Sequence, residues 1–164
     1  MRVLLILALL SGCATTKLPK VIEHDKTFNV YIERFKSDYK RITGKNIVVN
    51  FPISFFPVSR VYGHTAICVF SKVSDVRFIL IDTELWRNYN KVTREAVVYH
   101  ELGHCTKLGR MHNNDRYGNG RPKSLMNANV PKSRVYKRYR KEYLEELFLG
   151  NKDRDITETI KVGM

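Results

Sequence analysis

The feature that most constrains this chain is the segment His100-Glu101-Leu102-Gly103-His104, in which two histidines stand four residues apart. On an α-helix, side chains four residues apart lie on the same face, so both imidazoles can point at one metal ion. Glu101 then lies beside that ion and can act as a general base on metal-bound water, whose pKa zinc lowers toward neutrality. The segment therefore predicts a helix that carries a zinc site suited to hydrolysis.

The residues around this segment indicate that its helix enters a core. Ala96 to Tyr99 carry no charge, and Thr93 is the expected cap at the helix start. Gly103 lies inside the predicted helix, where glycine costs about 1 kcal/mol relative to alanine. A glycine at that position indicates that another part of the structure approaches the helix backbone closely.

The first twelve residues resemble the signal peptide of a bacterial lipoprotein. Arg2 precedes an apolar run over residues 3–10 that is too short to span a bilayer, and Leu10-Ser11-Gly12-Cys13 has the form of the lipoprotein box. By this resemblance Cys13 becomes the lipid-modified first residue of an exported protein, anchored to a membrane of the bacterial envelope. If the host is Gram-negative, the residue after the cysteine resembles an outer-membrane sorting signal. A plain secretory signal and an apolar N-terminal strand are the alternatives.

Removing residues 1–12 leaves 152 of the 164 residues, enough for one domain with its own core. Residues 13–25 are polar, contain a proline and have no sustained periodicity, so we expect them to form a tether. Residues 26–150 form the predicted domain, and residues 151–164 form a C-terminal tail.

Hydrophobic periodicity predicts an α+β fold for this domain. Apolar residues spaced by three and four indicate an N-terminal helix over 28–43, and Gly44 ends it. Runs rich in β-branched and aromatic residues predict the strands of a short mixed sheet, at 46–56 (one strand or two), 65–71 and 76–81. A short helix is expected to start at Asp82.

Beyond the predicted metal helix, the chain becomes polar and rich in glycine and asparagine. This composition indicates a loop of about twenty residues, long enough to be functional. A last helix is expected over 132–149, where one side is apolar, and Gly150 closes it. The predicted domain therefore has an N-terminal helix, a sheet of three to four strands, the metal helix, a loop and a C-terminal helix.

The chain is strongly basic, with a formal net charge of +13. Long-range attraction then favours anionic partners. For an exported lipoprotein, these are expected to be anionic lipid headgroups or polymers of the cell envelope. Nucleic acid is not expected, because no recognisable nucleic-acid-binding motif accompanies the charge. Solubility alone is the alternative explanation.

Three cysteines occur in the chain, and two remain in the domain if Cys13 carries lipid. Cys68 falls in a predicted strand, and Cys105 directly follows the second histidine of the metal helix. An oxidising compartment permits a disulfide between them. We nevertheless expect two buried free thiols, because nothing in the sequence brings their Cα atoms within bridging distance.

Several features, in this order, resemble the metzincin-type zinc metallopeptidases: the two histidines, a later glycine, a third histidine and Ser124-Leu125-Met126-Asn127. Small bacterial and phage metallopeptidases that contain the sequence HELGHC are similar in particular. The resemblance covers roughly residues 76 to 130. It implies a zincin-like fold with His100, His104 and His112 as zinc ligands, Glu101 as the catalytic base, and Met126 in a methionine turn beneath the metal.

The chain departs from the metzincin pattern between the second and third histidines. Gly109 lies five residues after His104, where the family has three. Two extra helical residues shift a helix end by about 3 Å and rotate it by more than half a turn, so the chain must reverse differently to bring His112 to the metal. We favour His112 as the third ligand. The alternatives are acidic residues of the same loop and of the last helix, namely Asp115, Glu142, Glu145 and Glu146.

Two functions remain open at this point. The first is a zinc-dependent metalloendopeptidase, which acts on peptide or protein substrates aligned along an exposed strand. The second is a non-catalytic basic envelope lipoprotein with a vestigial zinc site. Tyr117 and Tyr136 can donate a hydrogen bond to an oxyanion, although packing is their favoured role. His24 and His64 receive no function.

Overall fold

The computed structural model describes residues 24–70, 76–109 and 111–150. The predicted signal peptide, the lipidation site Cys13, most of the tether and the tail at 151–164 lie outside these residues. Their roles therefore stay predictions. Within the described part of the chain, no helix has both the length and the apolar character needed to cross a membrane.

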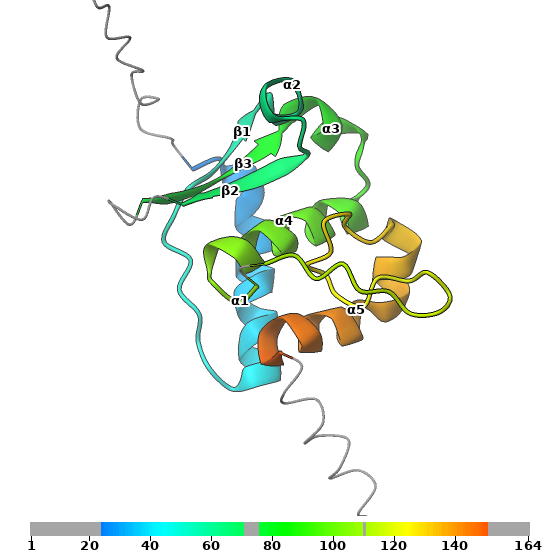
Figure 1. Ribbon diagram of the computed structural model, residues 1–164. Coiled ribbons are helices and arrows are strands. Elements are labelled where there is room, and N and C mark those ends of the chain that lie inside the picture. The colour runs from blue at the N-terminus through cyan, green and yellow to red at the C-terminus, as the bar shows by residue number, and fades with distance from the viewer. Residues whose placement is uncertain (1–23, 71–75, 110, 151–164) are drawn as a thin grey trace, which may run out of the picture.

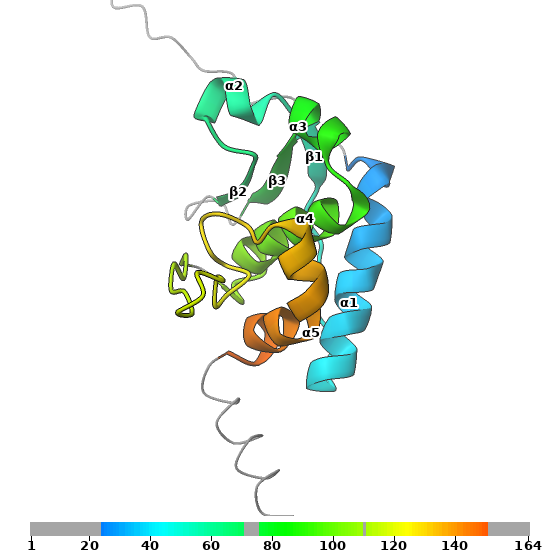
Figure 2. The ribbon, with the colours of Figure 1, turned by 90° about the vertical axis from the view of Figure 1, so that its right-hand side faces the viewer.

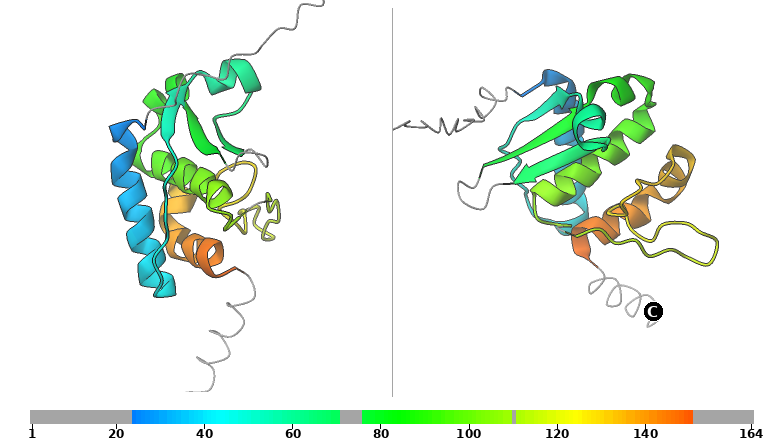
Figure 3. Two further views of the ribbon diagram at one scale, coloured as in Figure 1. Left: turned by 90° about the vertical axis from the view of Figure 1, so that its left-hand side faces the viewer. Right: turned by 45° about the horizontal axis from the view of Figure 1, so that its top comes forward.

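The central element of the fold is helix α4 (Lys91–Cys105), which lies between a small sheet and helix α5 (Ser133–Leu149) (Figure 1). Helix α1 (Asn29–Thr43) follows a short 3-10 turn and packs against both α4 and α5. The loop after residue 110 lies on the other side of α4 from α1 (Figures 2 and 3). The expected α+β class is confirmed, and the arrangement is compatible with a small zincin-like domain.

The sheet has three strands in the order β1-β3-β2. Strand β1 (Ile53–Phe56) runs parallel to β3 (Arg77–Asp82), and β2 (Ala66–Phe70) runs antiparallel to β3. Among the described residues, β2 pairs with β3 alone, so its other edge belongs to no ladder. Strand β2 is also in contact with α4, and the Cys68 backbone hydrogen-bonds to Glu101 of that helix.

The first strand is shorter than the sequence predicted, because it begins only at Ile53. Pro52 has no N–H to donate to a ladder, although its carbonyl accepts a hydrogen bond from the Ile79 N–H at 2.9 Å. The following residues form helix α2 (Val58–Tyr62), a short helix that was not expected from the sequence. Gly63 ends this helix with a φ of 69°, a left-handed conformation that glycine adopts without a steric penalty.

The start of α4 corrects one expectation. Asn90, not Thr93, caps the helix, and its side-chain oxygen accepts hydrogen bonds from the N–H groups of Val92 at 3.0 Å and Thr93 at 2.9 Å. Both residues are capable caps, but the helix starts where a side-chain oxygen first reaches free N–H groups. Thr93 therefore lies inside the first turn.

Helix α3 (Thr83–Asn88) begins where the sequence predicted, with Asp82 as its cap. The Asp82 carboxylate accepts hydrogen bonds from the N–H groups of Glu84 and Leu85, and from both the N–H and the hydroxyl of Ser59 in α2. Burial alone would raise the pKa of Asp82, but these hydrogen bonds outweigh it and hold the pKa at about 2. One carboxylate thus joins α2, α3 and the end of β3.

A buried polar network fixes the rotation of α4 about its own axis. Glu95 of α4 accepts hydrogen bonds from the Tyr136 hydroxyl at 3.1 Å and from Arg140 at 2.6 Å, both in α5. Arg140 also donates to Asp38 of α1, which accepts a second bond from the Tyr99 hydroxyl at 2.9 Å. Because Glu95 and Tyr99 bind the other two helices, the side of α4 that carries His100 and Glu101 is turned toward the loop and β2.

Candidate metal centre

The two histidines of α4 converge as their spacing predicts. His100 is buried and His104 is half-buried, and their Nε2 atoms lie 3.1 Å apart. Nitrogen ligands placed about 2.0 to 2.1 Å from one tetrahedral ion lie roughly 3.3 Å from each other. The pair therefore has the geometry of two ligands of one ion.

His112 completes a cluster of three imidazoles. It is exposed, and its Nε2 lies 3.2 Å from the Nε2 of His104. The ligand atoms of the three residues all lie within 4.8 Å of one another. Among the described residues, no other group of three or more histidine, cysteine or acidic side chains has this arrangement. Three imidazoles on one point imply a metal ion.

Three of the four acidic residues weighed as a third ligand have other partners. Glu142 pairs with Arg121 at 2.9 Å, and Glu146 accepts a hydrogen bond from the Ser124 hydroxyl at 2.8 Å. Glu145 lies 3.8 Å from the Lys141 ammonium, and Asp115 is exposed in the loop. None of the four belongs to the cluster of ligand atoms found in the described residues.

The two extra residues between His104 and Gly109 form a reversal of the chain. Helix α4 ends at Cys105, and Lys107 adopts a left-handed conformation with a φ of 67°. The Lys107 N–H donates to the His104 carbonyl at 3.2 Å, and the Gly109 N–H donates to the Gly103 carbonyl at 3.1 Å. The chain therefore turns back over the helix end, and the next residues lead toward the metal cluster.

Met126 lies beneath this turn and explains both glycines. A Cβ atom at Gly103 would lie 2.7 Å from the Met126 sulfur, and one at Gly109 would lie 2.5 Å from Met126 Cγ. Both distances are far below van der Waals contact. The close approach expected at Gly103 is therefore made by Met126, which is buried with 3 % of its surface exposed.

The residue before Met126 orients the first histidine. The His100 Nδ1 lies 2.9 Å from the Leu125 carbonyl oxygen, so Nδ1 carries the proton and donates it. The lone pair is then on Nε2, which faces the other two imidazoles. Burial lowers the pKa of His100 to about 4. The ring is therefore neutral at physiological pH, as a metal ligand must be.

Glu101 is buried beside the histidines, with 6 % of its surface exposed. Burial raises the pKa of its carboxyl group to about 8, although a hydrogen bond from the Cys68 backbone lowers it. A nearby cation would lower the pKa further. A carboxyl group whose pKa lies near neutral pH can both take up and release a proton, as a general base and acid must.

A cavity of about 220 Å³ brings these groups together. The three histidines and Glu101 line it on one side, and residues 64–68, which include most of β2, line the other. His64, for which the sequence indicates no function, is also part of this lining. Tyr136 is instead buried against Glu95, and Tyr117 does not line the cavity, so neither is placed to contact a substrate there.

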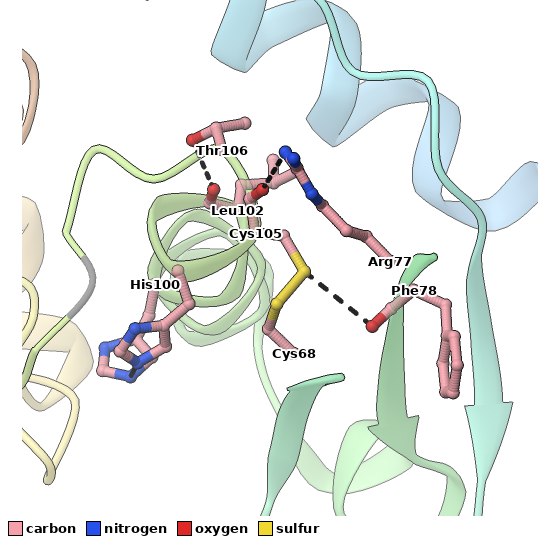
Figure 4. Close-up of a disulfide and its surroundings, with 8 residues drawn as sticks. Cys68, Arg77, Phe78, His100, Leu102, Cys105 and Thr106 are labelled. Atoms are coloured by element: carbon pink, nitrogen blue, oxygen red, sulfur yellow. Dashed lines mark hydrogen bonds between the residues drawn. A yellow bond between two sulfur atoms is a disulfide. The ribbon is translucent and has the colours of Figure 1, made fainter. Parts of the chain in front are cut away.

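A disulfide joins Cys68 and Cys105, which corrects the expectation of two free thiols. Their Cα atoms lie 5.7 Å apart, within the range that a disulfide bridges, although 37 positions separate them in sequence. Figure 4 shows that the bridge and His100 lie on different sides of α4. The Arg77 guanidinium donates to the Cys105 carbonyl at 3.2 Å beside the bridge. The wall of the cavity is thus covalently tied to the residue after His104.

Comparison with protein families gives one match. The family model described as "Putative phage metallopeptidase" matches residues 60–149, more than half of the chain. The matched segment includes all three clustered histidines, Glu101, both disulfide cysteines and Met126. No significant match was found among curated proteins or among solved structures.

Proposed function

The chain belongs to this family of phage metallopeptidases, and from that premise we propose that it is a zinc metalloendopeptidase. The observation that carries the proposal is the convergence of three imidazole Nε2 atoms beside a buried glutamate in one cavity. Three imidazoles with an open fourth position are a ligand set typical of catalytic zinc. The turn at Met126 supports a metzincin-like arrangement of the site.

The proposed mechanism is hydrolysis with Glu101 as the base. Zinc supplies a Lewis acid for the substrate carbonyl and lowers the pKa of water at the site. Glu101 accepts a proton from the attacking water as the water oxygen forms its bond to the carbonyl carbon. The same carboxyl group then donates that proton to the amide nitrogen as the C–N bond breaks.

Strand β2 is suited to hold the peptide. Its edge has no partner strand among the described residues, its Cys68 backbone hydrogen-bonds to Glu101, and residues 65–68 line the cavity wall. An extended peptide can add to such an edge through backbone hydrogen bonds, which fix its direction without demanding a particular sequence. The Cys68–Cys105 bridge holds this strand against α4, so the substrate and Glu101 keep a constant relative position.

We also propose that the protein is exported and anchored through a lipid on Cys13, with residues 13–25 as a tether. The lipoprotein box supports this, and a disulfide is typical of proteins in oxidising compartments. Cys13→Ser should abolish incorporation of radiolabelled lipid in a bacterial host. Equal labelling of the wild type and Cys13→Ser would contradict the lipid anchor. Attraction to an anionic envelope surface would then no longer explain the basic charge of the chain.

The decisive experiment measures zinc content and cleavage of a peptide library for the wild type and Glu101→Gln. We expect one zinc per chain in both forms and a loss of cleavage by about 10² to 10⁴ in the variant, because proton transfer contributes that much. Zinc binding without cleavage by the wild type would instead support the non-catalytic envelope lipoprotein.

The third ligand has its own test. His112→Ala should weaken zinc binding, whereas Asp115→Ala, in the same loop, should leave it unchanged. Titration with a competing chelator measures both affinities. The reverse result would assign the third ligand to Asp115.

A further inference from the structure

A second cavity, of about 490 Å³, adjoins the cavity of the metal centre. Val130 lines both, so the two cavities meet at the segment that follows Met126. Of the described residues that line the second cavity, three are cationic and none is acidic; the cations are Arg116, Arg121 and Lys132. The cavity therefore has the composition of a site for an anionic group.

Two of the cations are held in fixed positions. The Arg121 guanidinium lies 4.1 Å from the Tyr117 ring centroid and 3.8 Å from that of Tyr139, and it donates to Glu142 at 2.9 Å. Arg116 donates to the Gly120 carbonyl at 2.9 Å. A side chain that is already ordered loses less conformational entropy when a ligand binds. The contact of Arg116 therefore favours a binding role for this residue over a merely solvated charge.

The charge balance at the cavity stays positive. Glu142 offsets the charge of Arg121, while Arg116 is bound to a neutral carbonyl and Lys132 is exposed.

We propose that this cavity is a specificity subsite that binds an acidic side chain of the peptide substrate, on one side of the scissile bond. The proposal rests on the peptidase function proposed above. A peptide in the metal cavity lies between β2 on one side and Ala128 and Val130 on the other, all of which contribute to its lining. Its next side chains reach the second cavity across Val130. A carboxylate there accepts charge-assisted hydrogen bonds from Arg116 and Lys132.

A binding experiment tests the subsite separately from catalysis. The full chain carrying Glu101→Gln, loaded with zinc, is titrated with two fluorescent peptides that differ only by glutamate or glutamine at positions flanking the scissile bond. We expect the glutamate peptide to bind about five- to tenfold more tightly, as two partly exposed ion pairs allow. Adding Arg116→Ala and Lys132→Ala should abolish this preference.

The matched control removes two positive charges elsewhere. Lys45→Ala and Lys91→Ala change exposed lysines that line neither cavity, so the preference should persist. Equal binding of the two peptides, or equal loss of preference in both double variants, would overturn the subsite.

Cleavage assays on the wild type distinguish this failure from that of the enzyme. Cleavage of both peptides without a charge preference in binding would leave the peptidase standing and refute the subsite. A glutamate preference in binding that disappears only with Arg116→Ala and Lys132→Ala would support the subsite even if neither peptide were cleaved, whereas the peptidase proposal would then fail.

Discussion

Gly109→Ala should destabilise the domain, because Met126 occupies the space of the added methyl group. The new Cβ would lie 2.5 Å from Met126 Cγ and 2.9 Å from its sulfur. Cγ is close to the backbone and cannot swing away as the end of the side chain can. The neighbouring residues Leu125 and Asn127 are also buried, so the backbone of Met126 has little room to move.

The size of the effect follows from two opposing contributions. Overpacking of a filled core costs about 1 to 3 kcal/mol. Replacing glycine by alanine restricts the unfolded chain and returns about 0.4 to 1 kcal/mol. We therefore expect a net loss of about 1 to 2 kcal/mol in the free energy of unfolding. In a Met126→Ala background the clash is absent, and Gly109→Ala should then be neutral or slightly stabilising.

Urea unfolding followed by the fluorescence of Trp86, the single tryptophan, measures this. A chelator keeps all samples free of metal, so that metal binding does not contribute to stability. With an m value of about 2 kcal/mol/M, the midpoint should fall by roughly 0.5 to 1 M. Gly118→Ala is the matched control, because no atom lies within 4 Å of its added Cβ.

A clash with Met126 is contradicted if Gly109→Ala is as stable as Gly118→Ala, or if its effect simply adds to that of Met126→Ala. A second readout concerns the metal. Because the Leu125 carbonyl orients His100, a displaced Met126 turn should weaken zinc affinity by about tenfold, in line with the loss of other contacts that orient a ligand.

Three further predictions concern stability. The folded-state pKa of Asp82 is about 2, below its ordinary value of 3.8, so this carboxylate contributes about 2 kcal/mol to the free energy of unfolding above pH 3.8. That contribution is lost as the pH falls toward 2. Asp82→Asn should remove most of the contribution at pH 7, as measured by urea unfolding. Reducing the disulfide between Cys68 and Cys105, which lie 37 positions apart, should lower the free energy of unfolding by up to about 4 kcal/mol, because the unfolded chain gains entropy. Unfolding with and without reductant measures this loss. The double variant Cys68→Ser with Cys105→Ser should be equally stable under both conditions. Glu95→Gln removes one of the two carboxylates that pair with Arg140, while Asp38 remains, and should cost about 1.5 to 3 kcal/mol in thermal unfolding. A loss below about 1 kcal/mol would contradict a structural role for this network.

Local spacing was sufficient to predict the metal helix, since four residues along a helix bring two histidines to the same face whatever surrounds them. Gly103 was equally informative, because an interior glycine needs a reason and Met126 is that reason. The cap was misjudged at Thr93 because Asn90 competes for the same N–H groups. The strand at 46–56 was drawn too long because β-branched residues favour extended chain with or without a partner strand.

What the sequence determined by itself is therefore the α+β class, the pairing of His100 with His104, and the position of Glu101 beside them. These depend on contacts between residues close in the chain. Only the tertiary structure brought His112 to the cluster, joined Cys68 to Cys105 and placed the basic cavity next to the metal centre. Each of these depends on how loops close in space, and the direction of a chain reversal such as that at Lys107 cannot be deduced from residue spacing alone.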